Sequence, residues 1–238
     1  MCNINILHLI EGAKQARGLT VIIDVFRAFS LECYLYDMDV EQIRPVGTVE
    51  EAFALKRRIQ NSILIGERHG EKCDGFDYGN SPSTILKKDV AGKTIIHTTS
   101  AGTQGIVNAT HAGEIITGSL VNAKAVAEYI LARQPQTVSL VCMGNGGVRL
   151  APEDELCAKY IKSILEGREF LDLEQKVSSL KNNGGKHFFD KSKQSIFPEA
   201  DFHMCIEYNK FPFVITIEKD EIGFVASRKN VRGKTAVN

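Results

Sequence analysis

Short apolar runs rich in β-branched residues alternate along this chain with segments of helical pattern. Clear examples of the apolar runs are residues 20–25 (TVIIDV), 62–67 (SILIGE) and 137–144 (TVSLVCMG). Strands that are apolar on both faces occur where helices cover both sides of a mostly parallel sheet. The alternation therefore predicts an α/β fold with three layers, α/β/α, built on a mostly parallel mixed sheet.

The remaining elements follow from periodicity and cap residues. Thr48 stands before two glutamates at the start of residues 48–60, which is typical of a capped helix N-terminus. Residues 213–227 (FVITIEKDEIGFVAS) indicate a C-terminal antiparallel hairpin, which we expect to extend the sheet at its edge. Residues 184–189 (GGKHFF) are expected to form a loop. Further strands are expected at 42–47, 93–99 and 114–119, and further helices at 27–38, 101–111, 122–133, 151–167 and 172–183.

One compact domain accounts for this pattern. The chain has 238 residues, enough for one large core, and it contains neither an internal repeat nor a low-complexity linker. We expect the domain to span residues 1–231. The last residues, 232–238 (RGKTAVN), carry no core pattern and are expected to be a disordered tail.

Charge and cysteine content limit the partners of the chain. Lys+Arg and Asp+Glu balance at 29 each, so no overall field draws the chain to nucleic acid or to a membrane. No segment resembles a signal peptide or approaches the roughly 20 apolar residues of a membrane span, and we expect a cytoplasmic protein. Six scattered cysteines without a C-x-x-C pair are expected to be reduced and mostly buried. A homo-oligomer is compatible with the sequence.

Polar residues cluster where the expected strands end. Asp24 ends the first strand, Glu67 and Arg68 end another, and Glu153 and Asp154 follow a glycine-rich segment after residue 144. In open α/β sheets, ligands bind beyond the carboxyl ends of the strands, where helix N-termini point their free N–H groups. The sequence therefore predicts a ligand site at this end of the sheet.

Three turns of small and hydroxyl residues indicate that the ligand is an anion. They are residues 78–83 (YGNSPS), 95–105 (IIHTTSAGTQG) and 143–148 (MGNGGV). Hydroxyls and bare backbone N–H groups at the start of a helix bind oxyanions, although the same residues also serve as plain helix caps. The glycines of the third turn do not form G-x-G-x-x-G, and no Walker loop is present, so a nucleotide site is weakly supported. The residues that we expect to bind the substrate are Arg68, Asn80, Ser81, Thr98, Thr99, Gly102, Thr103, Asn145, Gly146 and Gly147.

Carboxylates from separate segments indicate a hard cation. Asp24 follows a run that should be buried, where an aspartate costs free energy unless it is paired or metal-bound. Arg27 is an alternative partner for it. Mg²⁺ prefers one or two carboxylates together with water and phosphate oxygens. We expect Asp24, Glu153 and Asp154 to be the metal ligands, although Glu153 and Asp154 also suit a helix start electrostatically.

The motifs taken together resemble those of the 2-phosphosulfolactate phosphatase family. The resemblance rests on four blocks in the order of the family, which cover about two thirds of the chain. They are IIDVFRAFS (22–30), GERHG with GFDYGNSP (66–82), TTSAGTQG (98–105) and GNGGVRLAPEDELCA (144–158). Two blocks depart from the usual family pattern: Phe29 replaces a threonine in the first, and Ser100-Ala101 replaces Thr-Asn before Gly102 in the third.

The resemblance implies a Mg²⁺-dependent phosphatase that converts (2R)-phosphosulfolactate to sulfolactate and phosphate in coenzyme M biosynthesis. Our hypothesis is hydrolysis of a small anionic phosphoester, with Asp24, Arg27, Glu67 and Asp154 as the catalytic residues. Asp24 and Asp154, with help from Glu67 or Glu153, would hold Mg²⁺, while Arg27 and Arg68 would clamp the anion.

The sequence is compatible with several other functions. The chain is compatible with a phosphatase of a different small phosphorylated acid, or with a covalent route through Cys142 or a threonine. A non-catalytic binding module for an anionic metabolite would use the same turns. A nucleotide-dependent enzyme, with the glycines of residues 144–147 in its nucleotide site, is a further alternative.

Overall fold

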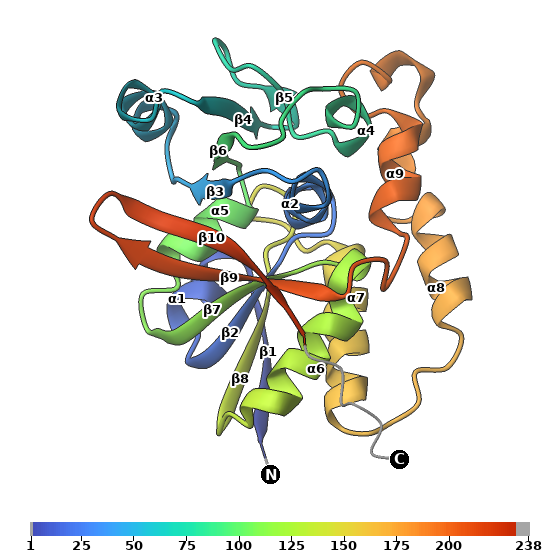
Figure 1. Cartoon of the computed structure of the whole chain (residues 1–238). Coiled ribbons are helices and arrows are strands. Elements are labelled where there is room, and N and C mark those ends of the chain that lie inside the picture. Colours follow the sequence, from blue (N-terminus) through green and yellow to red (C-terminus); the bar gives the residue numbers. More distant parts are fainter. Residues whose placement is uncertain (1, 232–238) are drawn as a thin grey trace, which may run out of the picture.

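A computed structural model describes residues 2–231 of the chain (Figure 1). The tail predicted at 232–238 lies outside the described residues. The strands form one ten-stranded sheet, in the spatial order β1 (Asn3–His8), β8 (Thr137–Cys142), β2 (Gly18–Ile23), β7 (Ala112–Gly118), β9 (Phe213–Asp220), β10 (Gly223–Asn230), β3 (Gln42–Pro45), β6 (Thr94–Thr98), β4 (Ser62–Arg68) and β5 (Glu71–Lys72).

Helices cover both faces of this sheet, while α8 and α9 pack on other helices at its side (Figure 1). The helices of the described residues are α1 (Leu9–Gln15), α2 (Ala28–Asp37), α3 (Val49–Arg58), α4 (Pro82–Ile85), α5 (Gly102–Asn108), α6 (Ala123–Arg133), α7 (Pro152–Leu165), α8 (Leu173–Ser179) and α9 (Glu199–Cys205). Short 3₁₀ turns lie at η1 (Leu120–Asn122), η2 (Leu180–Asn182), η3 (Lys186–Phe189) and η4 (Lys191–Lys193). The predicted α/β class with a mostly parallel mixed sheet is confirmed. Residues 184–189 are not simply a loop, because most of them form η3.

The sheet consists of two parallel groups joined by the hairpin. Strands β1, β8, β2 and β7 are parallel neighbours, as are β3, β6 and β4. The hairpin β9–β10 pairs antiparallel with β7 on one side and with β3 on the other. The prediction that this hairpin lies at the edge of the sheet is therefore wrong. Its strands are apolar at Phe213–Ile217 because they are buried at the centre of the sheet.

Alternate residues of β2 belong to different cores. Val21 and Ile23 pack with residues of α6 and α7, whereas Ile22 packs with residues of α1, α2 and α5. Each side chain is fully buried, and burial of an isoleucine or valine contributes about 1.5–3 kcal/mol. A third, smaller core lies between α3 and the group of β4 and β6, around Leu55, Leu64 and Ile96. The continuous apolar pattern of the strands thus reflects helices on both faces.

The two parallel groups direct their carboxyl ends toward one region. In Figure 1, β1, β8 and β2 rise from the lower part of the view, while β3, β6 and β4 run across the top. A sheet of this width accumulates a large twist, and the twist changes the strand direction across the sheet. Asp24, which follows β2, and Glu67, near the end of β4, consequently line the same cavity.

Candidate active site

A cavity of about 340 Å³ lies where the two groups of strands end. Its walls come from the ends of β2, β4, β6 and β8, from the start of α7 and from the segment that leads to α9. The lining residues are Asp24, Phe26, Arg27, Glu67, His69, Gly70, Asn80, Ser100, Ala101, Gly144, Asn145, Gly146, Leu150, Ala151, Pro152, Glu153, Asp154, Gly184, His187 and Phe197. The sequence-predicted carboxylates Asp24, Glu67, Glu153 and Asp154 are therefore brought together by the fold.

Asp24 is buried at the end of β2 and faces two backbone segments. Its Oδ1 accepts a hydrogen bond from the backbone N–H of Ala28 at 3.2 Å. The backbone of Gly102 approaches so closely that a Cβ there would lie 2.9 Å from Asp24 Oδ2. Burial, followed by the charges of Asp154 and Glu67, raises the pKa of Asp24 well above its usual range. This carboxylate therefore needs a cation or a proton nearby.

Asp154 connects the ends of two strands to the first turn of α7. Its Oδ1 accepts from the backbone N–H of Val25, and its Oδ2 accepts from that of Gly144, both at 2.8 Å. Gly144 has φ +65°, and a Cβ there would lie 2.1 Å from the carbonyl oxygen of Arg149, so this turn requires glycine. Burial and the neighbouring charge of Glu153 raise the pKa of Asp154 despite these two hydrogen bonds. Asp154 thus fixes the cavity wall and adds to its negative charge.

Glu153 carries an unpaired oxygen at the cavity. Its side chain is buried, and Oε2 has no hydrogen-bond partner in the described part of the chain. Burial raises the pKa of Glu153 to about 7, and the charge of Asp24 acts in the same direction. A buried carboxylate oxygen without a donor is costly, and a bound cation would relieve that cost.

The stability of the metal-free protein should consequently fall as pH rises. A carboxyl group whose pKa is raised by folding binds its proton more tightly in the folded chain. The contribution of Glu153 is therefore fully present below about 4.5, its unfolded pKa, and is lost as pH rises through about 7. Thermal melting without divalent ions, between about pH 5 and 8, should show a falling midpoint, with a smaller fall in Glu153→Gln. The exposed substitution Glu128→Gln is the control, and an unchanged slope in Glu153→Gln would contradict the assignment.

Glu67 holds two loops of the cavity wall. Its Oε1 accepts from the backbone N–H of Ser100 at 2.6 Å, and its Oε2 accepts from the backbone N–H of Gly70 at 2.7 Å. The Ser100 hydroxyl donates to Oε2 as well, at 3.2 Å. These contacts place Glu67 in the wall and orient the loops that follow β4 and β6.

Arg27 reaches the cavity from the start of α2 and pairs with a residue that sequence analysis missed. Its Nη1 donates to Asp201 Oδ2 at 2.8 Å, and both side chains are almost fully buried. The guanidinium also lies over the ring of Phe197, at 4.9 Å from its centroid. The alternative that Arg27 pairs with Asp24 is therefore wrong, because Asp201 takes that position.

A buried hydrogen-bonded chain supports Asn80. Asn80 Oδ1 lies 3.2 Å from His97 Nε2, and His97 Nδ1 lies 2.9 Å from Glu32 Oε1. His97 and Glu32 are fully buried, and Asn80 lines the cavity. Asn80 is thus held in one orientation by residues of the core.

Seven predicted substrate-binding residues do not line the cavity. Arg68 donates to Thr98 Oγ1 at 2.9 Å and to the carbonyl oxygens of Gly47 and Glu67. Ser81 donates to Asp201. Thr99 and Thr103 are buried at the start of α5, where each backbone N–H donates to the hydroxyl oxygen of the other residue. The predicted residues that do not line the cavity are Arg68, Ser81, Thr98, Thr99, Gly102, Thr103 and Gly147, whereas Asn80, Asn145 and Gly146 line it.

The segment between α8 and α9 supplies residues that no motif indicated. Gly184, His187 and Phe197 line the cavity, and Asp201 lies directly behind it. Burial and the charge of Arg27 lower the pKa of His187, so its ring is neutral near pH 7. The only sequence signal for this part of the site is the number of aromatic residues in 187–202. In the structure Phe188, Phe197 and Phe202 pack against one another or against Arg27.

Cys142 is not placed for covalent chemistry in this cavity. It is buried at the end of β8 and is absent from the cavity lining. Burial and the charge of Asp154 raise the pKa of its thiol, which is the opposite of what a nucleophilic cysteine needs.

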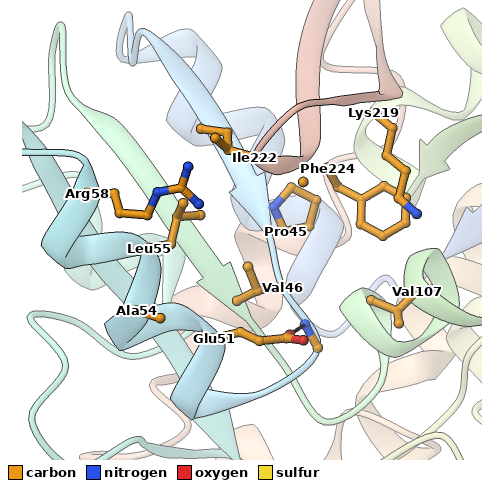
Figure 2. A pocket seen from close by; sticks show the side chains of 12 residues that line it. Pro45, Val46, Glu51, Ala54, Leu55, Arg58, Val107, Lys219, Ile222 and Phe224 are labelled. Carbon is orange, nitrogen blue, oxygen red and sulfur yellow. Dashed lines mark hydrogen bonds between the residues drawn. The ribbon is translucent and has the colours of Figure 1, made fainter.

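A second cavity, of about 450 Å³, lies between α3 and the β9–β10 hairpin (Figure 2). Its walls are largely apolar. Thr48 caps α3, as predicted, because its hydroxyl oxygen accepts from the backbone N–H of Glu51, and the Glu51 side chain accepts in turn from the backbone N–H of Thr48. Lys219 lies over the ring of Phe224. The cavity contains no pair of acidic side chains, so the carboxylate-lined cavity is the better candidate for phosphoester chemistry.

The acidic residues of the candidate active site fit a hard divalent cation. Carboxylate oxygens are preferred ligands of Mg²⁺, and Glu153 Oε2 is buried without a partner. Among the described residues, the ligand atoms of Asp24, Glu153 and Asp154 do not all lie within 4.8 Å of one another. Mg²⁺ needs only one or two carboxylates and completes its shell with water and phosphate oxygens, so a tighter cluster is not required.

Comparison with known proteins gives one consistent result. A family model described as 2-phosphosulpholactate phosphatase matches residues 4–220. A protein of Clostridium tetani named "Probable 2-phosphosulfolactate phosphatase" is 31% identical over 241 residues, covering 96% of this chain and 98% of its own. A protein of the same name in Bacillus subtilis is 28% identical and covers 85% of this chain and 88% of its own. Another, in Carboxydothermus hydrogenoformans, is 38% identical and covers 71% of this chain and 70% of its own.

The helices of residues 2–231 include none with the length and apolar character of a membrane span.

Proposed function

The chain belongs to the 2-phosphosulfolactate phosphatase family and is a phosphoric monoester hydrolase, and on this premise we propose that its carboxylate-lined cavity hydrolyses a small, highly anionic 2-phospho acid with the help of Mg²⁺. The substrate named by the family, 2-phosphosulfolactate, is the first choice. The proposed products are sulfolactate and phosphate, as in coenzyme M biosynthesis. A different small phosphorylated acid remains the alternative substrate.

One observation carries the proposal: four buried carboxylates, Asp24, Glu67, Glu153 and Asp154, surround a cavity whose buried arginine is already neutralised. Arg27 is paired with Asp201, so the wall as a whole is acidic. An anionic phosphoester would be repelled from such a cavity unless a cation entered with it. A divalent cation removes this conflict.

The residues divide into two proposed roles. Asp24 and Glu153, with Asp154 beside them, would hold Mg²⁺. When bound there, the ion would polarise the phosphoryl group and lower the pKa of a water molecule. Arg27 would bind the phosphate, carboxylate or sulfonate with the N–H groups that Asp201 and the carbonyl oxygens of Ile196 and Gly70 leave free, and these contacts fix its orientation. The Asn80 side chain and the backbone of Asn145 and Gly146 would add donors to the oxygens that gain charge in the transition state.

Metal removal tests the proposal directly. We expect phosphate release from 2-phosphosulfolactate to fall to background after treatment with EDTA and to return when Mg²⁺ is added in excess. Ca²⁺ serves as the control ion, because it prefers longer bonds and more ligands than Mg²⁺. Turnover that is indifferent to EDTA would refute the metal-dependent reaction, and tight ligand binding without turnover would favour a binding module.

A further inference from the structure

A second group of metal-binding side chains lies outside the cavity, at the ends of β1 and β8. His8 ends β1 and Cys142 ends β8, and the parallel register pairs these two residues directly. Glu155 reaches them from the first turn of α7. One ligand atom from each residue lies within 4.8 Å of the other two. None of the three residues lines the cavity that holds Asp24.

The contact between His8 and Glu155 is not an ordinary hydrogen bond. His8 Nε2 lies 2.5 Å from Glu155 Oε1, as in an ion pair with a protonated imidazole, and Oε1 is buried without a hydrogen-bond partner among the described residues. The second oxygen of Glu155 lies 3.7 Å from Lys159 Nζ. Glu155 Oε1 and the imidazole nitrogen are therefore both available to a third partner placed between them and the Cys142 sulfur.

The donor set differs from that of the cavity. Thiolate and imidazole prefer Zn²⁺ and related borderline cations, whereas Mg²⁺ prefers oxygen. Tetrahedral Zn²⁺, with bonds of about 2.0–2.3 Å, needs ligand atoms roughly 3.3–3.8 Å apart, which small side-chain movements would achieve here. The His8 side chain is 40% exposed, so an ion can enter from solvent.

We propose that His8, Cys142 and Glu155 bind one thiophilic divalent cation of the Zn²⁺ class, with water in the fourth position, at a site distinct from the proposed Mg²⁺ site. Three protein ligands and one open position is a common arrangement for Zn²⁺. The ligands come from two strands and a helix, which are rigid elements that hold them in register. Because α7 also carries Glu153 and Asp154, the ion would fix the first turn of the helix that forms one wall of the cavity.

Cobalt absorption tests the proposal on the full chain. Co²⁺ replaces Zn²⁺ at such sites, and a cysteine ligand produces a thiolate-to-cobalt charge-transfer band. We expect the metal-free wild type to develop this band with one equivalent of Co²⁺ and to lose it on addition of Zn²⁺. Cys142→Ser should abolish the band, and His8→Gln should weaken Co²⁺ binding by at least about 10-fold. If Cys142→Ser does not fold, the partly exposed His8→Gln variant carries the test.

Matched controls separate this site from other ligands. His203 lies 3.7 Å from Glu199 on an exposed face of α9 and belongs to no group of three possible ligands among the described residues, so His203→Gln should leave the band unchanged. Cys2→Ser removes the exposed thiol and should also leave it unchanged. Asp24→Asn should retain the band, which makes the result independent of the proposed phosphatase mechanism. The proposal is overturned if the wild type shows no band, if the band survives in Cys142→Ser, or if His8→Gln and His203→Gln bind Co²⁺ equally.

Discussion

Replacing Asp24 with asparagine is expected to lower the rate of phosphate release at least about 100-fold while leaving the fold intact. Asparagine keeps an oxygen that can accept the hydrogen bond from Ala28 but removes the charge that the proposed Mg²⁺ site needs. Burial and the charge of Asp154 raise the pKa of Asp24, so the charged form is unfavourable in the metal-free fold. The variant should therefore melt at the same temperature as the wild type, or higher. Steady-state phosphate release and thermal melting at about pH 8, above the pKa of about 7 of the neighbouring Glu153, measure both effects.

Asp37→Asn is the matched control for this experiment. Asp37 is an exposed aspartate at the end of α2, the helix that begins just after Asp24, and its replacement should change neither quantity. If Asp24→Asn retains most of the activity, Asp24 is not part of the catalytic site. If activity and stability fall together, the role of Asp24 is structural.

Replacing Arg27 with methionine is expected to reduce the free energy of unfolding by about 3–5 kcal/mol. The change leaves the carboxylate of Asp201 fully buried, with only the Ser81 hydroxyl and the backbone N–H of Ser83 to stabilise it. The double variant Arg27→Met/Asp201→Asn should recover much of the loss, because it removes the orphaned charge. Urea denaturation of the single and double variants gives the coupling energy.

The surface pair of Arg133 and Glu114 provides the comparison. Arg133 contacts both carboxylate oxygens of Glu114, as in a strong ion pair, but its side chain is 54% exposed. Arg133→Met should therefore reduce the free energy of unfolding by less than about 1 kcal/mol. Similar losses for Arg27→Met and Arg133→Met would show that the buried pair has no special role. Both Arg27 variants should also lose activity, since neither retains the cation that lines the cavity.

The sequence predicted the elements of the fold better than their arrangement. Apolar β-branched runs and the Thr48 cap identified most strands and helices of residues 18–165, because these signals are local. The position of the β9–β10 hairpin is a long-range property. An apolar run buried at the centre of a sheet has the same composition as one that is covered at the edge. The sequence alone therefore does not predict that the hairpin lies at the centre.

The same distinction applies to the candidate site. Asp24 was found because a carboxylate in a buried run costs free energy unless it is paired or metal-bound, and Glu67 because it ends another strand. Glu153 and Asp154 were found because they follow the glycine-rich segment at the same end of the sheet. Hydroxyl residues such as Thr99 and Thr103 serve equally well as caps and as ligands, and only the structure shows that they do not line the cavity. Asp201 lies on a short helix far along the chain, where nothing local marks its pairing with Arg27.

The central hairpin has a consequence for how the chain is made. Every candidate site residue, Asp201 included, emerges from the ribosome before β9 and β10, which span residues 213–230. Until those strands are synthesised, β7 and β3 have no common neighbour, and the two halves that carry Asp24 and Glu67 are not joined through the sheet. We therefore expect the candidate active-site cavity to be completed late in synthesis. All of its residues appear first, and the hairpin that joins the two halves of the sheet contributes none of them.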